Sequence, residues 1–311
     1  MFVLRGIAVS LTFFWFCYCI SSVVVVCGWR CLERLRGFSP RFFATLLIFA
    51  RILPFALSAT ATLLVAAPSF VLLEPRGADE DIGVRPLFLI AGCLVFIVVG
   101  LVRVIRAQID TSHVISGWMR GARELNIGAP TPTFQVASAT PPLTLAGVCR
   151  PRLLLSTSAL ARLTAGELAV AVRHEIAHMR SHDNLKKLTL RFAWFPGMGQ
   201  LEKAWQEAAE VAADHAAVSN ATQALDLADA LIKLSRLVTR QPLPPISVTF
   251  VHDAVGVRVS RLLNWEKMSF RSARKFYQLM VCSAVAILMA TALAYGSVLK
   301  QTHTLTEWLV R

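Results

Sequence analysis

Four long apolar segments constrain the fold of this chain more than any other feature of its sequence. A helix needs about 20 residues to cross the hydrocarbon core of a bilayer. Segments near that length with few or no charges occupy residues 7–28, about 45–73, 87–105 and 279–298. We therefore expect a mainly α-helical integral membrane protein with four transmembrane helices.

The composition agrees with membrane residence and narrows the choice of partners. Of the 311 residues, 55% are hydrophobic and only 16% are charged, whereas an average soluble domain has about a quarter of its residues charged. The net charge of +13 is typical either of nucleic-acid binding or of loops beside anionic lipid. No basic segment interleaved with aromatic residues stands out. We therefore expect the lipid bilayer as a partner and no direct nucleic-acid binding.

The basic residues of the short loops predict the orientation, because loops rich in Lys and Arg stay in the cytoplasm. The loop after the second apolar segment is acidic, with Glu74 and the run 79–81. The N-terminus should therefore lie outside. The residues that mark the cytoplasmic side are Arg30, Arg34, Arg36 and Arg41 after the first span, Arg103, Arg106, Arg120 and Arg123 after the third, and Lys267, Arg271, Arg274 and Lys275 before the fourth.

This orientation divides the chain into three parts. Residues 1–105 should form a three-span membrane region, and residues 106–277 a cytoplasmic domain inserted between spans three and four. Residues 278–311 should hold the fourth span and a short outer tail. The expected localisation is thus a multi-pass membrane protein with its largest polar region in the cytoplasm.

Arg51 interrupts the second apolar segment. A charge inside a membrane-spanning helix can be functional. We expect instead that the Arg51 side chain snorkels to the inner membrane surface. It would then mark the true start of the second span, with Pro54 in the first turn of the helix.

The region between spans three and four is long enough for one compact domain. Its first part contains short apolar runs separated by prolines, which predict strands. These runs are 133–137, 143–148 and 152–156. A helix should begin after Thr164, because Thr164 and Glu167 have the spacing of a capping box. The sequence therefore predicts an α+β domain.

The strongest chemical signal is the HExxH motif formed by His174, Glu175 and His178. Residues four apart share one face of a helix, so both imidazoles can bind a single metal ion. Glu175 is then placed to take a proton from the attacking water and pass it to the leaving amine. The motif predicts a hydrolytic site with one Zn²⁺ per chain and Glu175 as its catalytic residue.

A third zinc ligand is required, and the sequence offers three candidates. His182 continues the i, i+4 row of the motif but lies a turn too far along the helix. Glu210 could close a His, His, Glu site from a second helix, and Asp214 one turn later could hydrogen-bond a ligand histidine. His215 is the remaining alternative. We favour Glu210, mainly because of the resemblance described next.

Several segments of the chain together resemble the BlaR/MecR-type membrane zinc metallopeptidases, which are antirepressor sensor-transducers of beta-lactam resistance. The matching segments are HEIAHMRSHDN at 174–184, an aromatic-proline turn at 194–196, EVAAD at 210–214 and a proline-rich stretch at 141–151. The arrangement of three spans before the domain and one after it is also similar to that family. The resemblance implies a gluzincin-like, zincin-type domain in the bacterial cytoplasmic (inner) membrane.

The resemblance also implies roles for individual residues. In that family the glutamate of the later ExxxD pattern is the third metal ligand, which corresponds here to Glu210. The implied metal ligands are therefore His174, His178 and Glu210, with Asp214 and Asp183 supporting them. The implied activity is that of a zinc metalloendopeptidase in signal transduction, with a DNA-binding repressor as its protein substrate.

The chain departs from these sensors at its C-terminal end. The sensors carry a large extracellular penicillin-binding domain after the fourth span, whereas only about a dozen residues follow residue 298 here. We therefore expect no direct beta-lactam sensing. A separate sensor protein, or the membrane itself, would have to deliver the stimulus.

Two other functions compete with the signalling endopeptidase. One is a quality-control or processing protease of the HtpX or CAAX type. The HtpX type places two spans between its HExxH motif and its glutamate ligand, but only 31 residues intervene here. The other is a non-proteolytic transducer that uses the zinc domain for binding, which would have no physical need for Glu175. For the endopeptidase, we expect strand 152–156 to be the sheet edge to which a peptide substrate adds.

Overall fold

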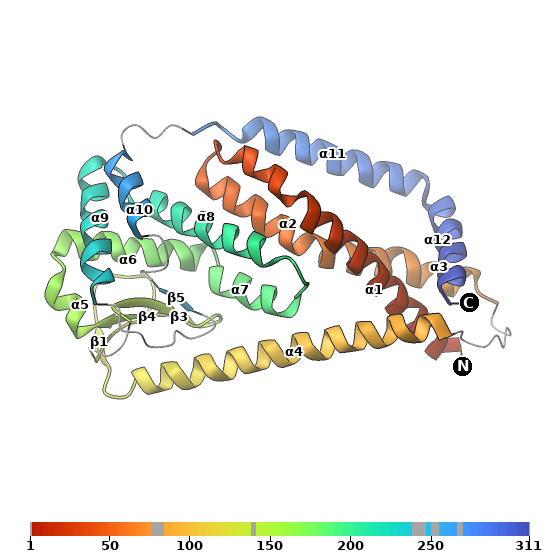
Figure 1. The fold of residues 1–311 in the computed structure, drawn as a ribbon, viewed down its shortest axis with the longest axis horizontal. Helices are drawn as coiled ribbons and strands as arrows, with labels where there is room; N and C mark the ends of the chain where they lie inside the picture. The colour runs from red at the N-terminus through yellow and green to blue at the C-terminus, as the bar shows by residue number, and fades with distance from the viewer. Residues whose placement is uncertain are drawn as a thin grey trace.

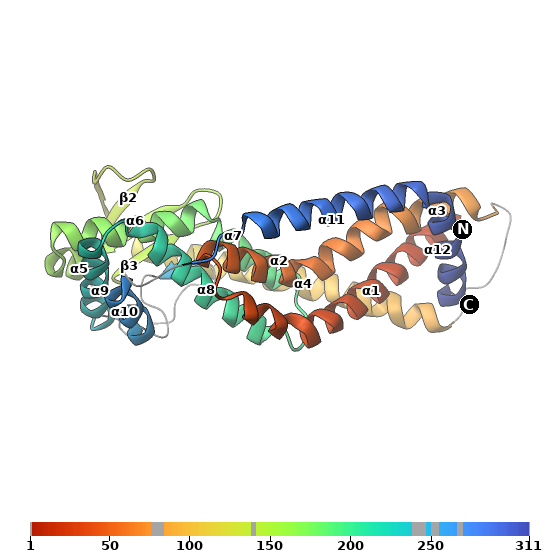
Figure 2. The same ribbon diagram turned by 90° about the horizontal axis from the view of Figure 1, so that it is seen from above.

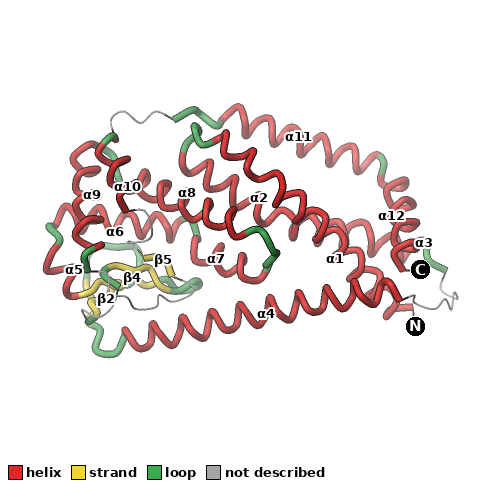
Figure 3. Tube along the Cα trace, in the orientation of Figure 1, coloured by secondary structure: helices red, strands yellow, loops and turns green. Residues whose placement is uncertain are grey.

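The computed structural model describes residues 2–75, 84–137, 141–237, 247–249, 255–265 and 270–310. It is an elongated, mostly helical molecule with one small sheet at one end (Figures 1 and 3). In these ranges, four helices are long and apolar enough to cross a membrane, which confirms the expected apolar helices. The acidic run 79–81 and Lys267, which entered the predicted orientation, lie outside the described residues.

The first two candidate spans are longer than the apolar runs that predict them. Helix α1, Phe2–Gly28, continues into the short 3₁₀ helix η1, Trp29–Leu35. Helix α2, Pro40–Ala61, continues through the π turn η2, Thr62–Ala66, into α3, Ala67–Leu73. The second span begins at its proline, not near residue 45, because a proline at the first helical position loses no hydrogen bond.

Arg51 does not snorkel to a membrane surface, so that prediction was wrong. It lies inside α2 with only 1% of its surface exposed. Its Nη2 atom lies 2.8 Å from Glu202 Oε1 and donates a 2.7 Å hydrogen bond to the Ala193 carbonyl. The guanidinium is held inside the protein because the first turn of α8 brings the Glu202 carboxylate to it, and the end of α7 brings the Ala193 carbonyl. Pro54, expected in the first turn, therefore lies in the helix interior.

Replacing Arg51 with alanine should lower the free energy of unfolding by about 3 kcal/mol, the lower end of the cost of breaking a buried ion pair. The lower end applies because the Glu202 side chain keeps 29% of its surface exposed. The matched control is Arg36→Ala, whose pair with Glu33 is exposed and should contribute at most about 1 kcal/mol. Denaturant unfolding in detergent micelles compares the two. Equal destabilisation by both variants would contradict the assignment.

The third and fourth candidate spans also end elsewhere than hydropathy suggests. Helix α4 covers Val84–Trp118 and so continues past the predicted boundary at residue 105. A helix does not need to stop where its apolar stretch stops, and arginine is a good helix former. Helix α11, Arg274–Leu293, is followed by α12, Tyr295–Val310. The expected short outer tail is therefore a helix, which packs against α3 and α1 (Figure 2).

Helix α11 shows most directly that this bundle needs an apolar solvent. None of its 20 residues is buried, although most of them are apolar, and it lies along the outside of the bundle in Figure 1. A monomeric protein in water rarely exposes a contiguous apolar surface of this extent. The four apolar helices and this bare surface together indicate membrane association.

The three predicted strands belong to a five-stranded sheet in the order β1-β2-β4-β3-β5, of which β1 and β5 were not predicted. The strands are β1 Arg123–Leu125, β2 Thr133–Val136, β3 Leu143–Ala146, β4 Arg152–Ser156 and β5 Ser247–Thr249. Strand β4 pairs in parallel with β2 and antiparallel with β3. The prediction that 152–156 is a sheet edge was therefore wrong. A strand whose leucines 153–155 are all buried belongs in the interior of a sheet.

Six further helices complete the part of the fold around the sheet. They are α5 Thr157–Arg162, α6 Ala165–Arg180, α7 Asp183–Phe192, α8 Gly199–Ala217, α9 Ala221–Ser235 and α10 Val255–Leu263. Helices α6 and α9 pack on the sheet around a leucine-rich core. Helix α8 also packs along α2, where Trp205 and Leu201 meet Leu47. Helix α8 thus connects the sheet region with the apolar bundle (Figure 1).

Candidate metal centre

Helix α6 carries the HExxH motif and is fixed at both ends. At its start, Glu167 N–H donates to the Thr164 hydroxyl, and Thr164 N–H donates to the Glu167 carboxylate. This confirms the predicted capping box, which satisfies two otherwise unpaired backbone groups. The face of the helix that holds Val170 and Ala171 packs into the core. As a result, His174 and His178 are directed into the protein and are 0% and 1% exposed.

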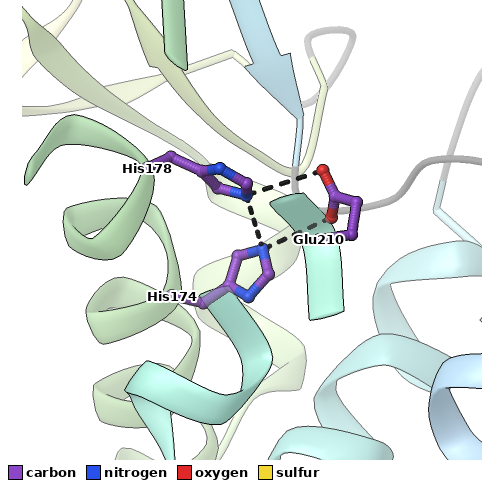
Figure 4. A group of neighbouring side chains, drawn as sticks. All are labelled: His174, His178 and Glu210. Carbon is purple, nitrogen blue, oxygen red and sulfur yellow. Dashed lines mark hydrogen bonds and ion pairs between the residues drawn. The ribbon is translucent and has the colours of Figure 1, made fainter. Parts of the chain in front are cut away.

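Helix α8 brings Glu210 to these two histidines (Figure 4). The Nε2 atoms of His174 and His178 lie 3.1 Å apart. Each of them lies 3.5 Å from a different carboxylate oxygen of Glu210. Of the candidate third ligands, the structure therefore brings Glu210 to the histidine pair.

The spacing of these three side chains fits a small tetrahedral cation. Ligand atoms about 2.0–2.1 Å from a tetrahedral zinc ion are separated from one another by about 3.3–3.4 Å. The observed separations of 3.1 and 3.5 Å lie on either side of that value. His174, His178 and Glu210 could thus hold one metal ion and leave the fourth tetrahedral position for water or substrate.

Carboxylates behind the histidines orient both rings. Asp183 Oδ2 lies 2.7 Å from His178 Nδ1, and Asp214 Oδ1 lies 3.0 Å from His174 Nδ1. A carboxylate beside Nδ1 favours the proton on that nitrogen, which leaves a lone pair on Nε2. Two lone pairs and a carboxylate then converge on one point, which is a chemical environment that suits a metal cation.

The electrostatics of the cluster also favour positive charge at this point. Burial alone would lower the pKa of His178, but Glu210 and Asp183 outweigh it and raise that pKa to about 10. Burial would raise the pKa of Glu210, yet His178 and Arg258 hold it well below its usual range. A metal ion would supply the same positive charge and displace the histidine proton.

Glu175 lies on the same helix and has no exposed surface. Its Oε2 atom accepts a 3.2 Å hydrogen bond from the Leu145 backbone N–H on β3. Burial raises the pKa of Glu175 to about 7, against the opposing effect of the two histidines. A carboxylate with a pKa near neutrality suits general-base catalysis, and a bound dication would favour its charged form.

Residues at the start of α7 connect helix α6, which carries the two histidines, to the sheet. His182 has a φ of 54°, a left-handed conformation that turns the chain sharply between α6 and α7 and returns Asp183 to His178. Next to it, Asn184 Nδ2 donates a 2.9 Å hydrogen bond to the Gly147 carbonyl after β3. Gly147 itself has a φ of +97°, and a Cβ there would lie 2.8 Å from the Arg150 carbonyl oxygen. Only glycine fits this turn.

The two alternative histidines lie elsewhere. His182 is exposed. His215 packs its ring against Trp265 and Phe270, with ring centroids 5.0 and 5.3 Å away. Neither belongs to the group of side chains, within the described part of the chain, that could hold a metal with His174.

Sequence reasoning missed one residue of the cluster, Arg258 on α10. It lies 2.9 Å from Glu210 Oε2 and contacts Asp214 as well. The stretch around it, VGVRVSRLL, holds two arginines at ordinary helical spacing. No feature of that pattern distinguishes the buried one from the exposed one.

Fold and site together define a mainly helical, membrane-associated chain in which two buried histidines and a partly buried glutamate could hold a metal ion. Searches against protein-family models and against curated proteins find no match to this chain.

Proposed function

We propose that this protein is a membrane-embedded zinc endopeptidase. One observation carries the proposal: His174, His178 and Glu210 converge at near-tetrahedral spacing, and the buried carboxylate of Glu175 comes from the same helix turn. Three protein ligands with an open fourth position are typical of catalytic rather than structural zinc sites. One Zn²⁺ per chain is expected.

The positions of these groups determine the chemical role of each. Zinc, when bound, acts as a Lewis acid and lowers the pKa of water at its open position. Glu175 is the only carboxylate of the HExxH motif, and it would accept the proton of the attacking water and deliver it to the leaving amine. The Leu145 N–H holds one oxygen of Glu175, while Oε1 has no hydrogen-bond partner among the described residues and could receive the proton.

The substrate in this proposal is a protein or peptide, and the resemblance to the BlaR/MecR-type peptidases implies a DNA-binding repressor. Strand β3 contacts the proposed catalytic carboxylate, because the Leu145 N–H donates a hydrogen bond to Glu175. Its outer side is paired with β5 over three residues. A substrate that adds as a strand next to β3 would therefore have to replace or extend that pairing.

The proposed location is the bacterial cytoplasmic membrane, with the metal centre on the cytoplasmic side. The loop after α1 and the start of α11 lie at the same end of the bundle as the sheet (Figure 1). These are basic segments, with Arg34 and Arg36 in one and Arg271 and Arg274 in the other. A concentration of positive charge at one end of the spans is typical of the cytoplasmic side.

The test is metal-dependent hydrolysis by the purified full-length protein in detergent. We expect about one zinc per chain and cleavage of a peptide library that stops on treatment with a strong chelator and returns with added zinc. The double variant His174→Ala, His178→Ala should lose both properties. The matched control, His182→Ala, removes an exposed histidine near the site and should retain both. A wild-type chain that binds no metal would overturn the proposal.

A supporting carboxylate should affect metal affinity in a graded way. Replacing Asp183 by alanine removes the 2.7 Å contact with His178 Nδ1 and should weaken zinc binding by about 10- to 100-fold. Competition with a chromophoric chelator measures the affinity. Asp229→Ala on α9, which removes an exposed aspartate, is the control and should bind zinc like the wild type. Unchanged affinity in Asp183→Ala would show that Asp183 does not orient His178.

The alternative proteases and the non-proteolytic transducer are less well supported. Between His178 and Glu210 lie α7, with 10 residues, and the first part of α8. A helix of 10 residues is about 15 Å long, too short to cross a membrane, so the HtpX arrangement is disfavoured. A transducer without proteolysis would bind zinc yet cleave nothing, and the peptide-library experiment separates it from an enzyme.

A further inference from the structure

Arg258 is a buried arginine that contacts both carboxylates which α8 presents to the metal cluster. Only 4% of its surface is exposed. Its Nη1 atom lies 2.9 Å from Glu210 Oε2. Its Nε and Nη2 atoms donate 2.8 and 2.5 Å hydrogen bonds to the two oxygens of Asp214. All three of these nitrogen atoms are thus engaged near the metal ligands.

These contacts reach the histidines through the carboxylates. Glu210 and Asp214 are one helical turn apart, so both point from the same face of α8. Glu210 faces both Nε2 atoms of the histidine pair, and Asp214 Oδ1 faces His174 Nδ1. One guanidinium therefore sets the position of a metal ligand and of the group that orients another ligand.

The geometry of the contacts requires an arginine and not merely a positive charge. A guanidinium is planar and presents five N–H donors in a fixed fork, which suits bidentate binding of Asp214 together with a third bond to Glu210. A lysine ammonium is a point charge on a flexible chain and cannot impose three directions in this way. The second arginine of α10, Arg261, is exposed and provides a comparison from the same helix.

We propose that Arg258 is a positioning residue of the metal centre, which holds Glu210 and Asp214 in the geometry that binds zinc. Its contacts are with Glu210 and Asp214, and it acts through these two carboxylates. The inference deepens the proposed function and depends on it, because the ion whose binding it supports is the proposed zinc.

A cavity next to Arg258 makes the residue suitable for substitution. The cavity has a volume of about 370 Å³, and its walls include Arg258, Glu210, Phe43 and Phe270. A shorter or neutral side chain at position 258 can be hydrated from this space, so the loss of the guanidinium need not leave a dry void. We therefore expect Arg258 variants to fold.

The experiment compares zinc affinity, and the steady-state constants of peptide cleavage, in Arg258→Gln, Arg258→Lys and the control Arg261→Gln. Zinc alone is the probe, titrated against a chromophoric chelator with full-length protein in detergent. Arg258→Gln should bind zinc about 10- to 100-fold more weakly than the wild type, as for other groups behind metal ligands. At saturating zinc it should lower kcat with little change in KM. Arg258→Lys should restore only part of the loss, and Arg261→Gln should match the wild type.

Each outcome of this experiment either supports or overturns the positioning role of Arg258. Wild-type zinc affinity in Arg258→Gln, or full restoration by Arg258→Lys, would overturn the positioning role but leave the proposed function intact. A wild-type protein that binds no zinc would overturn both. If Arg258→Gln fails to fold, Asp214→Asn breaks the same link from the other side. Its combination with Arg258→Lys should then weaken zinc binding by less than the product of the two single effects.

Discussion

Replacing Glu175 by glutamine should leave about one zinc per chain and reduce peptide cleavage by about 100- to 10,000-fold, the usual contribution of a general base. Glutamine has nearly the same shape as glutamate and can still accept the hydrogen bond that Leu145 N–H donates to position 175. It cannot accept a proton from water. The variant therefore removes a chemical function and leaves the three metal ligands unchanged.

The measurement pairs metal content with the cleavage rate of the same purified sample. Glu207→Gln is the matched control, because Glu207 lies on α8 in the wall of the cavity beside Glu210 but not among the metal-ligand group. It should retain both zinc and activity. Cleavage at the wild-type rate by Glu175→Gln would exclude Glu175 as the base. A loss of zinc would instead show that its charge is needed to retain the ion.

Local patterns in the sequence predict the helix of the candidate site well. The capping box at Thr164 and the i, i+4 spacing of His174 and His178 depend only on residues close in sequence. Helix geometry is the same wherever it occurs, so such patterns determine which side chains share a face. The three predicted strands and the four apolar helices could be predicted for the same reason, because the periodicity or the length of each apolar run is a local property of the sequence.

Contacts between segments that are distant in sequence could not be predicted from such local patterns. That β4 is an interior strand depends on its pairing with β2 and β3, which no local pattern specifies. The same holds for Arg51, whose ion pair with Glu202 joins residues 151 positions apart. A hydropathy argument treats a charge in an apolar helix as facing lipid or water. Hydropathy alone cannot predict that another helix places a carboxylate beside this charge.

The contact between Arg51 and the turn before α8 connects the membrane helices to the candidate site. Arg51 and Tyr18 both donate hydrogen bonds to the Ala193 carbonyl, which ends α7. Helix α7 begins with Asp183, behind His178, and α8 carries Glu210. The carboxylates on both sides of the histidine pair thus belong to helices that are anchored at one turn to α1 and α2.

Substitution of Glu210 should have the second large effect on zinc binding. Without Glu210, the site would be a pair of buried histidines that lacks a third metal ligand. Replacing Glu210 by alanine should reduce zinc affinity by more than about 100-fold, beyond the typical cost of losing a supporting group. Two reasons act together. The ion loses a charged ligand, and Arg258, which lies 2.9 Å from Glu210 Oε2, keeps its positive charge without that partner and opposes a dication.

Metal content and cleavage of the Glu210→Ala variant should therefore fall together, unlike those of Glu175→Gln. Glu207→Ala removes a carboxylate from the preceding turn of the same helix and should keep the wild-type zinc content. Unchanged zinc in Glu210→Ala would mean that another side chain completes the site, and His215→Ala and His182→Ala would then identify it. If zinc is lost but thermal unfolding of the apo protein is unaltered, Glu210 acts as a metal ligand and not as part of the fold's framework. Arg258 keeps both of its hydrogen bonds to Asp214 in this variant, so the guanidinium is not left without a carboxylate, and the apo fold should lose less stability than in Arg51→Ala.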